Sequence, residues 1–225
     1  MLTIHHLGVS QSDRLVWLCE ELEIPYELKI HQRDPMLSPQ SIKDLHPLGA
    51  APIIQDGDLT LAETGACVEY IIHKHGNGRL VLSPSHKDYA TYLYWFHYAS
   101  ATLAPSTSRI MVLNLAQVDK SNPIYKIMGD KQHGYFQLMD DHLKTRTWLA
   151  GEEFTAADIM PIFALTTGRA FSSTDLSAYP NILAYLKRVT SRPAYQRYHE
   201  KADPTLPIFN EGPSPPTFME LKQKI

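Results

Sequence analysis

A hydroxyl-rich segment near the N-terminus carries the residues with the clearest chemical potential. Residues 2–14 read LTIHHLGVSQSDR, in which Ser10 and Ser12 follow an alternating stretch and precede an apolar pattern of helical spacing. A hydroxyl at a strand-to-helix turn faces the unpaired N–H groups and the positive dipole end of the helix. Such a place stabilises an anion, whether phosphate, carboxylate or thiolate. The same pattern also fits a serine that only caps the helix.

The cysteines and histidines do not follow a metal-binding pattern. Cys19 and Cys67 match no CxxC or zinc spacing and lie in apolar helical patterns, so we expect reduced, packed thiols. The pairs His5–His6 and His73–His75 lack further ligands at suitable spacing, which indicates surface or strand-edge positions. We therefore predict no metal site and no Ser-His-Asp triad.

The elements that must position the two serines alternate in type along the first third of the chain. The order is β-α-β-α-β-β-α, a compact α/β unit whose last two strands form an antiparallel hairpin around Asp56-Gly57-Asp58. After the first strand, the expected elements are a helix over 12–22, a strand over 25–30, a short helix over 38–45, strands over 51–55 and 59–62, and a helix over 64–74.

The rest of the chain shows only helical patterns. A capping-box spacing at Thr155 and Asp158 predicts a helix start, and Pro161 should bend that helix. Five prolines between 203 and 216 predict an irregular tail. We therefore expect two domains, an α/β domain over 1–80 and an all-helical domain over 86–225. The remaining expected helices cover 87–115, 123–143, 180–190 and 193–199.

Composition narrows the class of protein. The 225 residues carry a net charge of −3 without a long basic run, which argues against nucleic acid or an anionic membrane as a partner. No apolar segment is long enough to span a bilayer, and the N-terminus lacks a signal pattern. We expect a cytoplasmic protein.

Four motifs occur together in a familiar order. They are SQSDRLVWLCEELEIPYEL, HPLGAAPII, DGDLTLAETGACVEYI and FTAADI. With the change from α/β to all-α patterns, the chain resembles a cytosolic glutathione transferase of the serine type, most like the bacterial and fungal branch. The resemblance implies a thioredoxin-like N-terminal domain, an all-helical C-terminal domain, a homodimer, and detoxification chemistry with glutathione as co-substrate.

The resemblance also implies roles for individual residues. Glu63 and Thr64 match the pair that binds the γ-glutamyl group, with Glu63 on its ammonium and Thr64 on its carboxylate. Pro52 matches the family's cis-proline, and the backbone of Ala51 would pair with the cysteinyl segment like an added strand.

One position departs from the family pattern. Family members often carry a lysine two residues before the cis-proline, where it reaches the glycyl carboxylate, and this chain has Ala50 there. Losing a charged hydrogen bond costs about 1.5–3 kcal/mol. Gln40, Lys43 or His46 on the neighbouring segment are the candidate replacements.

The implied chemistry is attack of the glutathione thiolate on a small electrophile. Ser10 matches the serine that donates a hydrogen bond to the thiolate, with Ser12 as the second candidate. Two other functions fit the same motifs: a glutathione-dependent peroxide or disulfide reductase, and a non-catalytic binding protein that keeps the fold. The absence of a lysine at Ala50 favours the second of these.

Overall fold

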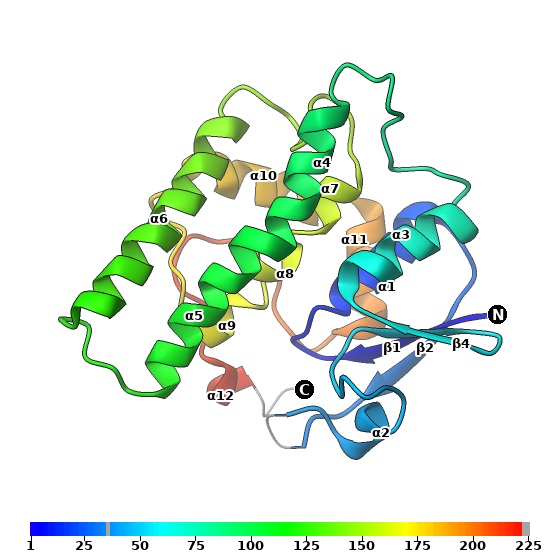
Figure 1. Ribbon diagram of the computed structural model, residues 1–225, viewed down its shortest axis with the longest axis horizontal. Coiled ribbons are helices and arrows are strands. Elements are labelled where there is room, and N and C mark those ends of the chain that lie inside the picture. The colour runs from blue at the N-terminus through cyan, green and yellow to red at the C-terminus, as the bar shows by residue number, and fades with distance from the viewer. Residues whose placement is uncertain (35–36, 222–225) are drawn as a thin grey trace. The chain divides into compact units, whose positions relative to one another are not determined.

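The chain divides into two compact units. The computed structural model describes residues 1–34 and 37–221 (Figure 1). The first unit contains Met1–Val81 and Thr190–Ile208, and the second contains Leu82–Val189 and Phe209–Phe218. Residues 190–208 thus pack with the first unit, although they follow the helical region in sequence. The domain limits 1–80 and 86–225 stay a prediction.

The first unit contains a four-stranded mixed sheet of order β2-β1-β3-β4. β1 pairs parallel with β2 and antiparallel with β3, and β3 pairs antiparallel with β4. This arrangement confirms the expected thioredoxin-like fold. The expected helix over 38–45 is shorter, because Pro39 serves as its N-cap. The elements are β1 (Leu2–Leu7), α1 (Asp13–Leu22), β2 (Glu27–His31), α2 (Gln40–Lys43), β3 (Ile53–Asp56), β4 (Leu59–Ala62) and α3 (Thr64–Lys74).

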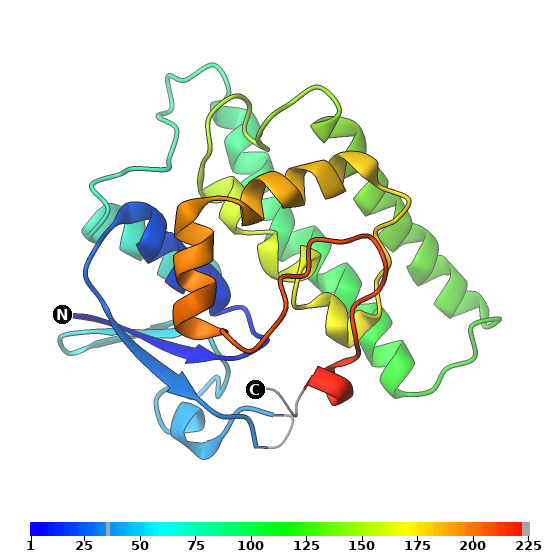
Figure 2. The ribbon, with the colours of Figure 1, turned by 180° about the vertical axis from the view of Figure 1, so that it is seen from behind.

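Helix α1 lies at the centre of the first unit's core. It packs on α3 and, from the other side, on α11 (Pro193–Ala202), which lies beside it in Figure 2. Cys19 of α1 and Cys67 of α3 are fully buried free thiols, as predicted. Burial raises the pKa of both thiols, that of Cys67 to about 12. Neither thiol is therefore a nucleophile near neutral pH.

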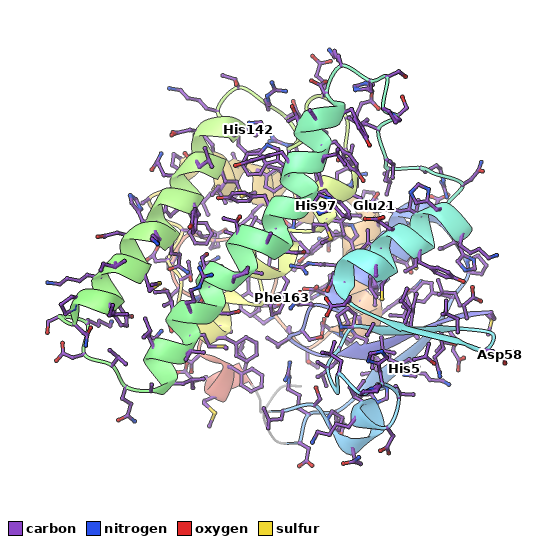
Figure 3. The ribbon with its side chains drawn as sticks, in the orientation of Figure 1. His5, Glu21, Asp58, His97, His142 and Phe163 are labelled. Atoms are coloured by element: carbon purple, nitrogen blue, oxygen red, sulfur yellow. The ribbon has the colours of Figure 1, made fainter. Side chains whose placement is uncertain are left out.

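The prediction that His5 and His6 lie at a surface or a strand edge is wrong. β1 is an interior strand of the sheet, so both side chains are buried. His5, labelled in Figure 3, lies with its two ring nitrogens 3.0 Å from His31 Nε2 and 3.0 Å from Gln55 Oε1. The HH pair interrupted an otherwise apolar alternation. Hydrogen bonds within the sheet compensate for the burial of His5, and a hydrogen bond with Ser12 in the following turn does so for His6.

The second unit is helical. α5 packs along α6, and Arg169 donates hydrogen bonds to the carbonyls of Glu211, Gly212 and Pro213, which hold the tail. The expected helix over 87–115 is interrupted by a π-helical turn, Ala99–Leu103. The elements of this region and the chain end are α4 (Tyr89–Tyr98), α5 (Ala104–Leu115), α6 (Pro123–Leu143), α7 (Ala156–Ile159), α8 (Ile162–Leu165), α9 (Arg169–Ser172), α10 (Pro180–Thr190) and α12 (Phe218–Leu221).

The capping box at Thr155 and Asp158 is present at the start of α7. α7 ends at Ile159, and Pro161 lies at the N-cap of α8. The predicted bend at Pro161 is therefore a complete break, because proline has no N–H to continue the helix. Within the described part of the chain, no helix is both long and apolar enough to cross a membrane.

Candidate functional site

Three chain segments that are distant in sequence meet at one end of the sheet. His5 of β1 pairs with Ile53 at the start of β3, and Ile53 pairs with Ala62 at the end of β4. The segments that continue from these strand ends are the turn 8–12, Ala51–Pro52 and Glu63–Thr64. The register of the sheet therefore brings the predicted site residues to the same edge.

Direct contacts connect two of these segments. Thr64 Oγ1 donates a hydrogen bond to Gln11 Oε1 over 3.3 Å, and Arg14 Nη1 donates to the same oxygen over 2.7 Å. Thr64 is the first residue of α3 and is buried, whereas Glu63 is exposed. The N-terminus of α3 is thus fixed against the serine turn, with a carboxylate at its exposed side.

The peptide bond between Ala51 and Pro52 is cis, as the resemblance implied. Pro52 is buried and Ala51 is half-buried. β3 begins immediately afterwards at Ile53. The backbone of residues 51–52 thus lies beside the strand ends, where an extended peptide can add to the sheet.

Ser12 does not cap α1 through its side chain. Its Oγ accepts a hydrogen bond from the Leu7 N–H over 3.1 Å and lies 2.9 Å from His6 Nδ1. Ser10 Oγ lies 2.7 Å from Ser12 Oγ and accepts a hydrogen bond from the Ser12 N–H over 3.2 Å. Ser12 is completely buried and Ser10 is 8% exposed, so Ser10 is the less buried of the two serines.

Sequence reasoning missed two residues behind these serines. His6 Nε2 lies 3.2 Å from Asp203 Oδ2, and Tyr198 donates a hydrogen bond to the same oxygen over 3.3 Å. Burial raises the pKa of Asp203, but the charge of His6 and the hydrogen bonds from His6 and Tyr198 outweigh this and hold it below its usual range. His6 shares one face of the strand with the apolar Leu2 and Ile4, which was a signal for burial. Asp203 follows α11, about 200 residues further along the chain, so no local pattern pointed to it.

A third missed residue holds the turn itself. Arg33 follows β2 and donates hydrogen bonds from Nε to the Gly8 carbonyl over 2.9 Å and from Nη2 to the Val9 carbonyl over 2.7 Å. Val9 has a positive φ of 54°, an uncommon conformation for a β-branched residue. These contacts fix the backbone that presents Ser10.

The candidates for the missing lysine differ in their surroundings. α2 packs through Ile42 on Ile53 and Ala62, which brings the helix to the same sheet end. Gln40 donates a hydrogen bond to Asp44 within its own helix over 2.7 Å. Lys43 is exposed, and a Cβ placed on Gly49 would lie 3.4 Å from Lys43 Cγ. The structure therefore brings Lys43, more than Gln40, to the neighbourhood of Ala50.

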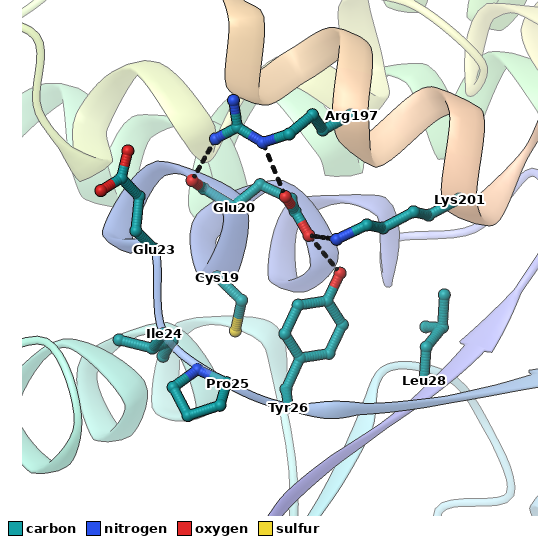
Figure 4. A pocket seen from close by; sticks show the side chains of 9 residues that line it. All are labelled: Cys19, Glu20, Glu23, Ile24, Pro25, Tyr26, Leu28, Arg197 and Lys201. Atoms are coloured by element: carbon teal, nitrogen blue, oxygen red, sulfur yellow. Dashed lines mark hydrogen bonds and ion pairs between the residues drawn. The ribbon is translucent and has the colours of Figure 1, made fainter.

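A pocket elsewhere in the first unit has different chemistry. It is a pocket of about 740 Å³ beside the C-terminal half of α1 (Figure 4). Glu20 accepts hydrogen bonds there from Tyr26, Arg197 and Lys201 over 2.7, 2.9 and 2.5 Å. Glu23 also lines the pocket, so that two carboxylates face two cations, and none of the predicted site residues lines it.

Comparison with known proteins agrees with the geometry. Residues 10–74 match the family profile "Glutathione S-transferase, N-terminal domain", and residues 93–193 match "Glutathione S-transferase, C-terminal domain". Glutathione S-transferase 3 of Schizosaccharomyces pombe is 33% identical, over 96% of this chain and 97% of the relative.

Solved structures give the same result. A glutathione S-transferase from Actinobacillus pleuropneumoniae is 31% identical, with a TM-score of 0.81 over 90% of this chain and 93% of the other. A glutathione transferase family member from Pseudomonas fluorescens, solved with two glutathione bound, shares the fold at 20% identity, with a TM-score of 0.71 over 88% of this chain and 91% of the other. The chain belongs to the glutathione S-transferase family of enzymes.

Proposed function

We propose that this protein conjugates the thiol of glutathione to electrophilic small molecules, in the manner of a detoxifying transferase. The observation that carries the proposal is the position of Ser10. Its hydroxyl is the last member of a buried hydrogen-bond chain, and Ser10, the less buried of the two serines, lies at the sheet end where residues 51–52 and 63–64 meet. We further propose a cytoplasmic homodimer.

Glutathione is an extended peptide, and the sheet end offers a group for each of its parts. Glu63 would pair with the γ-glutamyl ammonium, and Thr64 with the N-terminal N–H groups of α3 would receive its carboxylate. The backbone of Ala51 and Pro52 would bind the cysteinyl segment as an added strand. Lys43 would reach the glycyl carboxylate in place of the family's lysine.

The cysteinyl sulfur then lies over the serine turn. A free thiol has a pKa of about 8.5, so a minor fraction is thiolate at neutral pH. Lowering that value by one or two units requires about 1.4 kcal/mol for each, which a hydrogen bond from Ser10 and the helix dipole can supply. The thiolate attacks the electrophilic carbon, and the leaving group departs with its bonding electron pair.

The serine turn favours conjugation over thiol exchange. A disulfide reductase that works through a mixed disulfide with the protein needs a reactive protein thiol beside the glutathione sulfur. Residues 8–12 contain no cysteine, and Cys19 is completely buried with a raised pKa.

Calorimetry with glutathione and a conjugation assay with an activated aryl halide test this function together. We expect binding at millimolar glutathione or below, and a conjugation rate that falls about 10-fold to 100-fold in Ser10→Ala. Ser106→Ala is the matched control, since it removes another buried hydroxyl whose partner is the Leu103 carbonyl. Absence of binding at millimolar glutathione would refute the proposed function.

A further inference from the structure

His6, Ser12 and Ser10 form a chain of hydrogen bonds, and the protonation of His6 determines which group donates in each bond. Ser12 Oγ has one proton to donate and two lone pairs. One lone pair accepts the Leu7 N–H, which leaves His6 Nδ1 at 2.9 Å and Ser10 Oγ at 2.7 Å to take the proton and the other lone pair. The Leu7 carbonyl, at 3.5 Å, is a much longer alternative acceptor for the Ser12 proton.

When His6 is neutral, the two hydroxyl groups of this chain donate toward His6. The Asp203 carboxylate, 3.2 Å from Nε2, favours the tautomer with its proton on Nε2, so Nδ1 is an acceptor. Ser12 then donates to His6, and Ser10 donates to Ser12. In this state Ser10 Oγ accepts the Ser12 N–H and keeps one lone pair for the ligand, so it accepts a hydrogen bond from a thiol but cannot donate to a thiolate.

A protonated His6 reverses every bond of the chain. Nδ1–H donates to Ser12, Ser12 donates to Ser10, and the Ser10 hydroxyl proton points to the ligand. The two chain directions therefore match the two protonation states of a bound thiol. We propose, resting on the proposed function, that His6 is a positioning residue that takes up the glutathione thiol proton through Ser10 and Ser12, with Asp203 holding the imidazolium.

The step balances without another reactant. The S–H bond breaks and its electron pair stays on sulfur. The thiol proton moves to Ser10 Oγ, the Ser10 proton to Ser12 Oγ, and the Ser12 proton to His6 Nδ1. After the thiolate displaces the leaving group, the chain runs in reverse and the proton passes to the departing anion or to water.

The charged and titratable groups around His6 determine how its imidazolium form is stabilised. Asp203 lies in ion-pair contact, and its Oδ2 also accepts from Tyr198. Asp13 also interacts electrostatically with His6 and Asp203, and burial raises its pKa to about 7. Three further charged or titratable groups interact with His6 or Asp203: His31 at the end of β2, Arg33 just after β2, and His199 on α11.

The proton count on glutathione binding tests this inference on the unaltered protein. In weakly buffered solution near pH 7, thiolate absorbance gives the thiolate formed, and a pH indicator gives the protons released. Binding of S-methylglutathione, which has no ionisable thiol, supplies the baseline. We expect clearly less than one proton released for each thiolate formed. Release of one proton for each thiolate would overturn the inference.

Variants separate His6 from its neighbour on the same strand. In His6→Asn we expect one proton released for each thiolate, thiolate formation shifted to higher pH, and kcat/KM at pH 7 lowered about 100-fold. His5→Asn is the control, because His5 is equally buried but contacts His31 and Gln55 instead of the serines. We expect its proton count and pH profile to match those of the unaltered protein.

Folding and function are checked separately. Binding of S-methylglutathione and the thermal unfolding midpoint show that a variant keeps its site. If His6→Asn does not fold, Ser12→Ala interrupts the same chain and should give the same one-to-one proton count. A His6→Asn or Ser12→Ala protein with the unaltered proton count and pH profile contradicts the inference alone. An unaltered protein that does not bind glutathione contradicts the proposed function as well.

Discussion

Asp203 in the first unit and Asp158 in the second are both buried carboxylates, but their hydrogen bonds differ in kind. Asp158 accepts from the Leu149 N–H over 2.8 Å, from the Thr155 N–H over 2.9 Å and from the Tyr185 hydroxyl over 3.2 Å. All three donors are buried residues of the second unit. The Asp158 network is therefore closed to solvent.

Asp203 begins a network that does not end within itself. It contacts His6, and the contacts continue through Ser12 to Ser10, the least buried residue of the series. Each member of this series has a proton that can move or a second orientation. A buried network that is closed to solvent fixes a helix start. A buried network that leads to a less buried hydroxyl can instead form a hydrogen bond with a ligand.

The largest effect is expected where the network is closed. Asp158→Ala leaves the N–H groups of Leu149 and Thr155 without their acceptor, at about 1–3 kcal/mol for each. We expect a loss of about 3–4 kcal/mol in the free energy of unfolding at pH 7, measured by urea denaturation. Asp141→Ala is the control, since Asp141 accepts from the exposed Gln137 side chain. A loss below about 1 kcal/mol would make Asp158 dispensable.

The same carboxylate predicts a pH dependence. Burial raises the pKa of Asp158 to about 6 from an unfolded value near 3.8. The folded state thus binds this proton more tightly, so the stability it contributes is present below pH 4 and is lost as the pH rises through 6. The stability difference between the unaltered protein and Asp158→Ala should therefore widen from pH 7 to pH 4, by at most about 3 kcal/mol. Parallel urea titrations at both pH values check this, and a difference that narrows toward pH 4 has the wrong sign.

Substitutions at the candidate glutathione site should change the affinity for glutathione rather than the stability of the fold. Glu63→Gln removes the charge that would pair with the γ-glutamyl ammonium, which is worth about 2 kcal/mol, or about 30-fold in the glutathione Kd. Calorimetry measures the Kd, and the unfolding midpoint should stay unchanged. Glu69→Gln, on an exposed position of the same helix, is the control. Equal weakening in both variants would point to net charge instead of a specific contact.

The smallest expected effect is a gain. Ala50→Lys restores the cation that many family members place at this position, and should tighten glutathione binding by about 1 kcal/mol, or about 5-fold. Ala50→Gln controls for side-chain length without the charge. Lys43→Ala in the Ala50→Lys background should then cost little, whereas in the unaltered protein it should weaken binding. If Lys43→Ala is neutral in both backgrounds, Lys43 does not replace the missing lysine.

Local patterns predicted most of the fold. The alternation of Leu2 and Ile4, the Asp-Gly turn at 56–58 and the Thr155–Asp158 cap each act over a few residues, and each element lies where expected. The interruption of the helix over 87–115 was not predictable, because its apolar pattern continues through Ala99–Leu103.

The candidate site was predictable only in part. Ser10, the cis bond before Pro52 and the Glu63–Thr64 pair followed from motifs, whereas Arg33, His6 and Asp203 act across the sheet. Asp203 reaches β1 only because α11 packs back on α1, a contact that no short-range pattern contains. Long-range packing therefore supplied the part of the site that the motifs did not.

The most direct test of the account is the pH titration of thiolate absorbance for glutathione bound to the unaltered protein and to Ser10→Ala. We predict that the bound thiol ionises one to two pH units below the free value of about 8.5, and that Ser10→Ala returns most of this shift while still binding S-methylglutathione. Identical titrations for the two proteins would contradict the role of Ser10 as the donor to the thiolate.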